Sequence, residues 1–223
     1  MSAETTLREP PSARAERRCP ACEQPLYGWI VVGSADRRVR ERYVVDRCEE
    51  CGLGVTRGAA DPVAIFESAR TSLESGGTIE MRFANRASLQ AGIGGDRWAA
   101  LELPTQRLHL TPRSLTLLLE RHGLESVRMR QPPFGRNQAW MWQTLLNGFT
   151  FHTNFARDVL RGRLTPRTAR GRVMFAIDAL VSALAALPLA LVAAPLEIIA
   201  SLLRRGGELD VTVASGSRTG ERS

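Results

Sequence analysis

The spacing of apolar residues predicts a helix followed by a strand near the middle of the chain. Apolar positions recur every three or four residues over 63–73, which is the period of an amphipathic helix. Asp61 is the expected N-cap of this helix, and Pro62 fits its first turn. Gly76–Gly77 ends the helix, and Thr78–Ala84 alternates as a strand.

A second helix and two further strands are predicted after an intervening loop. Thr111 is an N-cap, Pro112 begins the helix and Gly123 ends it. Glu125–Arg130 then alternates as a strand, and Leu209–Ala214 is expected to be another. Helices that alternate with strands in this way predict an α/β fold with a layered sheet.

All four cysteines lie in two Cys-x-x-Cys pairs, Cys19/Cys22 and Cys48/Cys51, with 25 residues between the pairs. Two such turns can aim four thiolates at one tetrahedral ion, so the pattern predicts a Zn²⁺ site. Gly52 follows the second pair, where a knuckle turn favours positive φ. With four thiolates the ion is closed to substrate, so this site is expected to hold shape and not to catalyse.

Between the cysteine pairs, Tyr27–Val32 and Val39–Val45 are expected as strands joined by the polar turn Gly33–Arg38, which completes a zinc ribbon. The alternatives are a redox dithiol and a disulfide framework. A redox pair usually opens a helix after a strand, and neither pair here does so. A disulfide framework needs an oxidising compartment, and the N-terminus shows no apolar signal-peptide core.

The formal charge of +7 on 223 residues raises the question of a nucleic-acid partner. All 30 basic residues are arginine, which indicates a compositional bias of the whole chain rather than selection for phosphate contacts. The arginines are scattered apart from Arg37–Arg42 and Arg157–Arg172, so nucleic-acid binding is not favoured. Binding through the Arg37–Arg42 turn stays open as an alternative.

Ala179–Leu196 is an 18-residue run without a charge, close to the 20 or so residues that cross a bilayer. Pro188 and Pro195 divide it, and arginines lie on both flanks. Two interpretations stay open for the apolar helices expected over 173–203. They either span a membrane, or form a pair that lies on a membrane surface or covers the sheet.

Three stretches together resemble the late portion of class I S-adenosylmethionine-dependent methyltransferases, in a subgroup with an N-terminal zinc ribbon. Within Asp61–Asn85, Ser75-Gly76-Gly77 stands for that family's Pro-Gly-Gly turn and Ala84-Asn85 for its Pro-Asn. Arg97–Leu115 is similar to its Trp…Pro…His-Leu-x-His-Phe-Thr-Pro segment, and Gly206–Leu209 to the start of its final strand. The resemblance implies the C-terminal half of a Rossmann-like methyltransferase sheet.

The cofactor half of that fold is not found in the sequence. No strand is followed by the Gly-x-Gly-x-Gly turn that lets a backbone approach the cofactor. Only nine residues, Gly52–Ala60, separate the last cysteine from the helix of the late portion, whereas one βαβ unit takes about 30. The cluster Gly92-x-Gly94-Gly95 is expected to be a loop. S-adenosylmethionine is therefore not expected to bind.

The histidines offer one catalytic candidate, His109, which the resemblance places where the family has a base that faces the substrate. The alternative is an ordinary histidine near a helix cap. The family's other histidine position is Gln106 here, which cannot abstract a proton. His122 is expected at a helix end, where a cation is favoured, and His152 has no evident partner.

The expected organisation is a disordered tail, a zinc ribbon, a truncated methyltransferase-like region that includes the apolar helices, and a second tail, at 1–17, 18–57, 58–214 and 215–223. The strand Thr78–Ala84 would lack its usual neighbour, which invites pairing with another chain. The sequence thus predicts a cytoplasmic, degenerate methyltransferase-like scaffold, non-catalytic alone, that forms a homo-oligomer or binds a complete methyltransferase and associates with membranes through 173–203. The alternatives are an active or split methyltransferase of a small-molecule or envelope substrate, and a membrane-anchored or nucleic-acid-binding ribbon protein.

Overall fold

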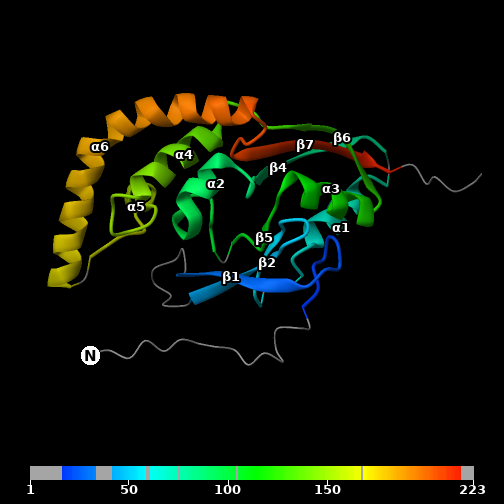
Figure 1. Ribbon diagram of the computed structural model, residues 1–223, viewed down its shortest axis with the longest axis horizontal. Helices are drawn as coiled ribbons and strands as arrows, with labels where there is room; N and C mark the ends of the chain where they lie inside the picture. The colour runs from blue at the N-terminus through cyan, green and yellow to red at the C-terminus, as the bar shows by residue number, and fades with distance from the viewer. Residues whose placement is uncertain are drawn as a thin grey trace, which may run out of the picture.

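The computed structural model describes residues 17–33, 42–58, 61–74, 76–103, 105–166 and 168–216. Most of the two expected tails, the ribbon turn at 34–38 and the arginine cluster up to residue 41 lie outside these ranges. Within them the chain forms a mixed α/β structure with two antiparallel sheets and a long apolar helix near its C-terminus (Figure 1).

The first sheet is built mainly from the N-terminal ribbon. Its strands are β1 (Leu26–Gly33), β2 (Arg42–Cys48), β3 (Gly54–Thr56) and β5 (Leu108–His109), in the order β1-β2-β3-β5 with antiparallel neighbours. The second strand ends three residues later than the expected Val39–Val45, because it continues into the second cysteine pair; positions 39–41 lie outside the described residues. Since β5 comes from far beyond the ribbon, this sheet joins the two parts of the chain.

The second sheet contains β4 (Thr78–Ala84), β7 (Glu208–Ser215) and β6 (Leu124–Arg130), in the order β4-β7-β6. All three strands were expected from the sequence. The last strand, β7, lies between the other two and is antiparallel to both, so β4 and β6 run parallel to each other. No strand among the described residues pairs with the outer edge of β4.

Two helices, α1 (Ala64–Ser72) and α3 (Pro112–Arg121), cover one face of this second sheet. Phe66 of α1 and Leu115 of α3 share a core with Val211 of β7, and all three are fully buried. The other face exposes polar side chains such as Glu80 and Arg128. One solvated face is typical of antiparallel sheets, whereas a doubly wound sheet has helices on both faces.

The start of α1 corrects one expectation. Asp61 has a φ of 34°, and the helix begins at Ala64 behind Val63, without a side-chain cap. By contrast, α3 has the expected Thr111 cap, with Pro112 at its first position and a reciprocal capping box with Ser114.

Three further helices, each shorter than the C-terminal helix, lie between it and the sheets: α2 (Leu89–Gly94), α4 (Arg136–Asn147) and α5 (Phe155–Leu160). The expectation that the glycine cluster forms a loop is therefore wrong in part. Gly92 and Gly94 are in α2, capped by Ser88, and Gly95 begins the 3₁₀ turn η2 (Gly95–Arg97). Ser88 supplied the N-cap signal that the sequence reasoning overlooked.

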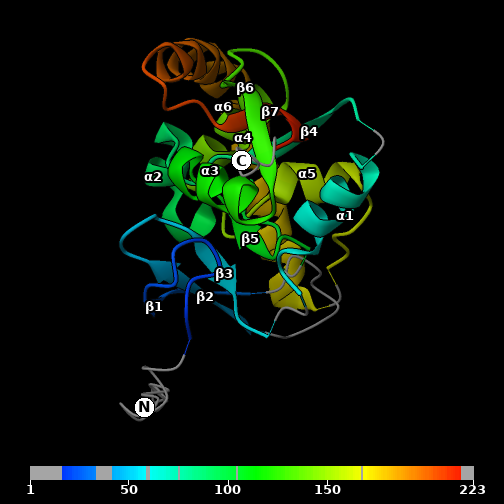
Figure 2. The same ribbon diagram turned by 90° about the vertical axis from the view of Figure 1, so that its right-hand side faces the viewer.

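The C-terminal helix α6 (Ala169–Leu202) is one continuous element, so the expected division into two helices is wrong. Pro188 and Pro195 lie inside it, and Figure 1 shows it bending around one side of the molecule and across the top, above α4. It is long and apolar enough to cross a membrane, and only 6% of its most apolar window is buried. Figure 2 shows that its C-terminal part lies at the opposite end of the molecule from β1 and β2.

Candidate metal centre

The two cysteine turns face each other at one end of the ribbon. In the first, the N–H of Glu23 donates to the carbonyl oxygen of Cys19 at 2.8 Å; in the second, the N–H of Gly52 donates to that of Cys48 at 3.0 Å. Gly52 has the expected positive φ of 75°, and Glu23 adopts 62° at the matching position. The two knuckles are therefore alike in backbone, although only one has glycine.

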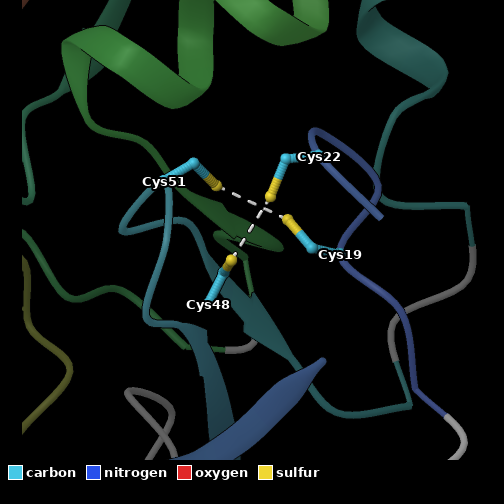
Figure 3. Close-up of side chains that lie close together, drawn as sticks. All are labelled: Cys19, Cys22, Cys48 and Cys51. Carbon is cyan, nitrogen blue, oxygen red and sulfur yellow. Dashed lines mark hydrogen bonds between the residues drawn. The ribbon is translucent and has the colours of Figure 1, made fainter. Parts of the chain in front are cut away.

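The four sulfur atoms form a compact group. The Sγ atoms of Cys19 and Cys51 are 3.5 Å apart, those of Cys22 and Cys48 are 3.4 Å apart, and all four lie within 4.8 Å of one another (Figure 3). Disulfide sulfurs would be about 2.05 Å apart. A tetrahedral ion with Zn–S bonds of about 2.3 Å separates its sulfurs by about 3.8 Å. The cluster is thus compatible with zinc.

The electrostatics of the cluster favour bound metal over free thiolates. Burial raises the pKa of the Cys19 thiol to about 11, and it raises the pKa of Cys51 as well. Burial also opposes ionisation of Cys48, but hydrogen bonds from the backbone N–H of Cys51 and from Cys22 outweigh it and lower the pKa of Cys48. A bound Zn²⁺ would supply the positive charge that lets all four cysteines ionise together.

Helix α3 fixes both knuckles from one side. At its N-terminus the Thr111 hydroxyl donates to the carbonyl oxygen of Cys51 at 2.7 Å, and Arg113 pairs with Glu50. At its C-terminus Arg121 pairs with Glu23. The cysteines also belong to the same core cluster as the apolar side of α3. The metal centre is consequently part of the main core and not a separately packed module.

His109, the catalytic candidate, lies in β5 and is 1% exposed. Its Nε2 is 3.2 Å from the hydroxyl oxygen of Thr56, and its Nδ1 has no hydrogen-bond partner among the described residues. Burial, with the nearby charge of Arg86, lowers the pKa of His109 to about 4. The imidazole is therefore neutral at pH 7 and inaccessible to solvent, which favours a structural role for His109.

A cavity of about 410 Å³ lies close by, between the start of α1, the end of β4 and the segment before β5. Gln106 lines it, whereas His109 does not. Its ionic lining is mainly basic and comprises Arg82, Arg107, Arg136, Arg161, Asp61 and Glu102. Three of these charges are paired with residues outside the lining, since Arg82 contacts Asp210, Arg136 contacts Glu208 and Glu102 contacts Arg157.

The other two histidines differ in outcome. His122 is the C-cap of α3, as expected, and its Nδ1 is 2.7 Å from the carbonyl oxygen of Leu118. The sequence shows no evident partner for His152, and the structure supplies one. Its Nδ1 contacts the carboxylate of Asp178, which also accepts from the backbone N–H groups of Phe151 and His152. The partner lies 26 residues away on α6, so no local pattern could reveal it.

A second buried carboxylate, Glu197, was also missed. It accepts hydrogen bonds from Gln90 of α2 at 3.1 Å, from Asn137 of α4 at 2.9 Å and from the N–H of Gly207 at 2.6 Å. The only signal in the sequence was that an acidic residue interrupts an apolar run, which usually marks a paired or functional group.

Comparisons with known proteins give no further assignment. No family model, no curated protein and no solved structure matches this chain.

Proposed function

We propose that this chain is a methyltransferase-like scaffold protein, held together by a structural Zn²⁺, that acts through a protein partner and not by catalysis alone. The unpaired outer edge of β4 carries this proposal. The sheet around β4 has three strands, and its outer backbone groups find no strand partner within the described ranges. Such an edge is a template for pairing with another chain.

Several contacts support the resemblance to the late half of a methyltransferase sheet. The last strand returns to the sheet that contains β4, as the resemblance requires. Asn85, which stands for the Asn of the family's Pro-Asn, is fully buried and donates to the carbonyl oxygen of Gly206 at 2.8 Å. The two segments that carry the resemblance thus meet at the end of β4.

The same geometry argues against independent catalysis. His109 is buried in β5, and Gly92 and Gly94 lie within α2 and not in the turn that joins β4 to α2, so this turn lacks the glycines that let a backbone approach a cofactor. The buried, reduced cysteines fit a cytoplasmic compartment. An active or split methyltransferase is the alternative, and it requires cofactor binding.

Two measurements test the scaffold proposal. Calorimetric titration with S-adenosylmethionine should give no heat above background, and micromolar binding would establish the alternative. Sedimentation velocity of the zinc-loaded protein should show a homodimer, or a complex once a complete methyltransferase is added. A folded monomer in both preparations would contradict the proposal.

Hydrogen exchange can place the partner. The amides of β4 should become more protected as the dimer or complex forms, whereas those of β6 should not change. Strand β6 is a matched control, because it is the other edge of the same sheet. Equal gains in both strands would indicate general stabilisation and not pairing at β4.

A second proposal rests on α6. Its length, apolar composition and exposure favour attachment of the scaffold to a membrane. The full-length protein should then float with lipid vesicles in a density gradient, and deletion of 173–203 should abolish flotation. Binding of DNA or RNA is not favoured, and a salt-dependent mobility shift lost on replacing Arg37, Arg38 and Arg40 would be needed to establish it.

A further inference from the structure

From Val173 to Leu202 the exposed face of α6 is broad and entirely apolar. Leu184, Leu187 and Leu191 are each 70% exposed. The other large apolar side chains on this face are Val173, Ile177, Leu180, Val192, Ile199, Leu202 and Leu203. Exposed alanines and prolines widen it further, namely Ala176, Ala183, Pro188, Ala190 and Pro195. An exposed apolar surface of this extent marks a contact with a protein or a lipid phase.

The two acidic residues of α6 both point into the body of the protein. Asp178 and Glu197 are 0% exposed. The Asp178 carboxylate accepts hydrogen bonds from two backbone N–H groups and contacts the ring of His152. The Glu197 carboxylate accepts hydrogen bonds from the side chains of Gln90 and Asn137 and from the N–H of Gly207. The helix is consequently tied to the domain near both of its ends.

These two attachments argue against a helix that crosses the bilayer. Asp178 and Glu197 are 19 residues apart, which is about 28 Å along a helix. The hydrocarbon core is about 30 Å thick. A crossing helix would have to pull one buried carboxylate away from its three donors and leave it across the hydrocarbon from the domain. Both attachments can persist only if α6 stays on one side of the membrane.

The exposed face also differs from the seam of a coiled coil. A coiled-coil seam is a narrow stripe flanked by charged positions that set the partner and its orientation. On α6 the exposed positions between Val173 and Leu202 are alanine, valine, isoleucine, leucine or proline, and none carries a charge. A second copy of the helix would leave much of this surface in water, whereas a lipid phase covers all of it.

The charges at the two ends of the apolar face are all positive. Exposed arginines there are Arg163, Arg170, Arg172, Arg204 and Arg205. None of them has an ion pair with a described acidic residue. Basic side chains that border an apolar helix face favour lipids with anionic headgroups.

We propose that the convex, exposed side of the bent helix α6 rests on an anionic bilayer surface, with its apolar face among the acyl chains and the end arginines at the headgroups. The inference rests on the proposed membrane attachment and deepens it, because it fixes the orientation and the lipid class. The domain then sits on one side of the membrane, held by Asp178 and Glu197 against the back of the embedded helix.

Vesicle flotation of the zinc-loaded full-length protein tests the lipid class. Vesicles of phosphatidylcholine with phosphatidylglycerol should bind at least about tenfold more protein than phosphatidylcholine alone, and 0.5 M NaCl should remove most of the difference. The double variant Leu184→Glu/Leu187→Glu should lose binding. Val31→Glu is the control, because Val31 is 56% exposed in β1, far from the C-terminal part of α6.

Protease sites inserted at 163–166 and after residue 216 test the orientation. With α6 on one side of the bilayer, protease added outside the vesicles should cut both sites. Protection of one site would show a crossing helix and overturn the inference, while leaving membrane attachment intact. Equal binding to the neutral vesicles would overturn the anionic lipid class, and it too would leave the attachment intact. Failure to float with either vesicle would overturn the attachment itself, and loss of a homodimer in the Leu184→Glu/Leu187→Glu variant would assign the face to a second copy.

Discussion

The Thr111 hydroxyl donates to the carbonyl oxygen of Cys51 at 2.7 Å, and its oxygen accepts from the N–H of Ser114 at 3.1 Å. One side chain thus caps α3 and holds a metal knuckle at the same time. The threonine methyl group also lies against the knuckle, because a Cβ at Gly52 would be 3.0 Å from it. The ribbon and the α/β part are joined at this residue.

Replacement of Thr111 by valine should lower the free energy of unfolding by about 2 kcal/mol, since it removes both the cap and the donor to Cys51. Urea unfolding of the zinc-loaded protein measures this. The control is Thr116→Val, because the Thr116 hydroxyl bonds to the Pro112 carbonyl oxygen on the exposed side of the same helix. A similar loss of unfolding free energy in both variants would mean that the Thr111–Cys51 contact contributes no extra stability.

The purified protein should contain one zinc ion per chain, measured by elemental analysis. Removal by a chelator should lower the melting temperature by more than about 10 °C, because the binding free energy of a structural zinc is folding free energy. The effect should reach α1 and α3, whose side chains share the core with the cysteines. The variant Cys22→Ser/Cys48→Ser should be insensitive to the chelator, and a chelator effect that persists there would point to another site.

The burial of His109 predicts a pH dependence of stability. The folded-state pKa is lowered from 6.5 to about 4, so the unfolded chain takes up a proton first. The contribution is fully present above about pH 7 and should be lost as the pH falls to 4, by about 3 kcal/mol in total. The difference between wild type and His109→Gln isolates this effect from acid release of zinc. Identical pH profiles would contradict the assigned environment.

Local signals in the sequence identified much of the fold. The cysteine spacing located the cluster, and the alternation in Thr78–Ala84 and the cap at Thr111 located elements that the structure contains. These features are decided by neighbours in the chain: a turn, a capping side chain or a period of two. The assignment to methyltransferases is not of this kind and stays a prediction.

Long-range relationships could not be read in the same way. The pairing of β5 with β3 joins residues more than 50 positions apart, and it places His109 in the ribbon sheet. The partner of His152 is on α6, and Glu197 gathers donors from three segments. Helix α6 continues through Pro188 where it packs against α4, and Trp142 there donates to the carbonyl oxygen of Ala186 at 2.9 Å. Tertiary contacts here override a local helix-breaking signal.

The network around Glu197 leads to a last prediction, at Gly207. A Cβ at this position would lie 1.6 Å from Nε2 of Gln90 and 3.2 Å from Oε1 of Glu197. Gln90 would have to move, and Trp98, whose Nε1 donates to the Gln90 side-chain oxygen at 3.2 Å, would lose its partner. Gly207→Ala should therefore lower the free energy of unfolding by about 3 kcal/mol.

The matched control is Gly92→Ala, because Gly92 is exposed in α2 and a Cβ there meets no atom within 4 Å. Alanine is the better helix former, so this variant should gain up to about 1 kcal/mol. Urea unfolding of both variants gives the comparison. If Gly207→Ala lowers the free energy of unfolding no more than Gly92→Ala does, the Gln90–Glu197 network is not packed closely around Gly207. In that case α6 would not be fixed to the domain through Glu197, and one of the two attachments that hold it on one side of the membrane would be lost.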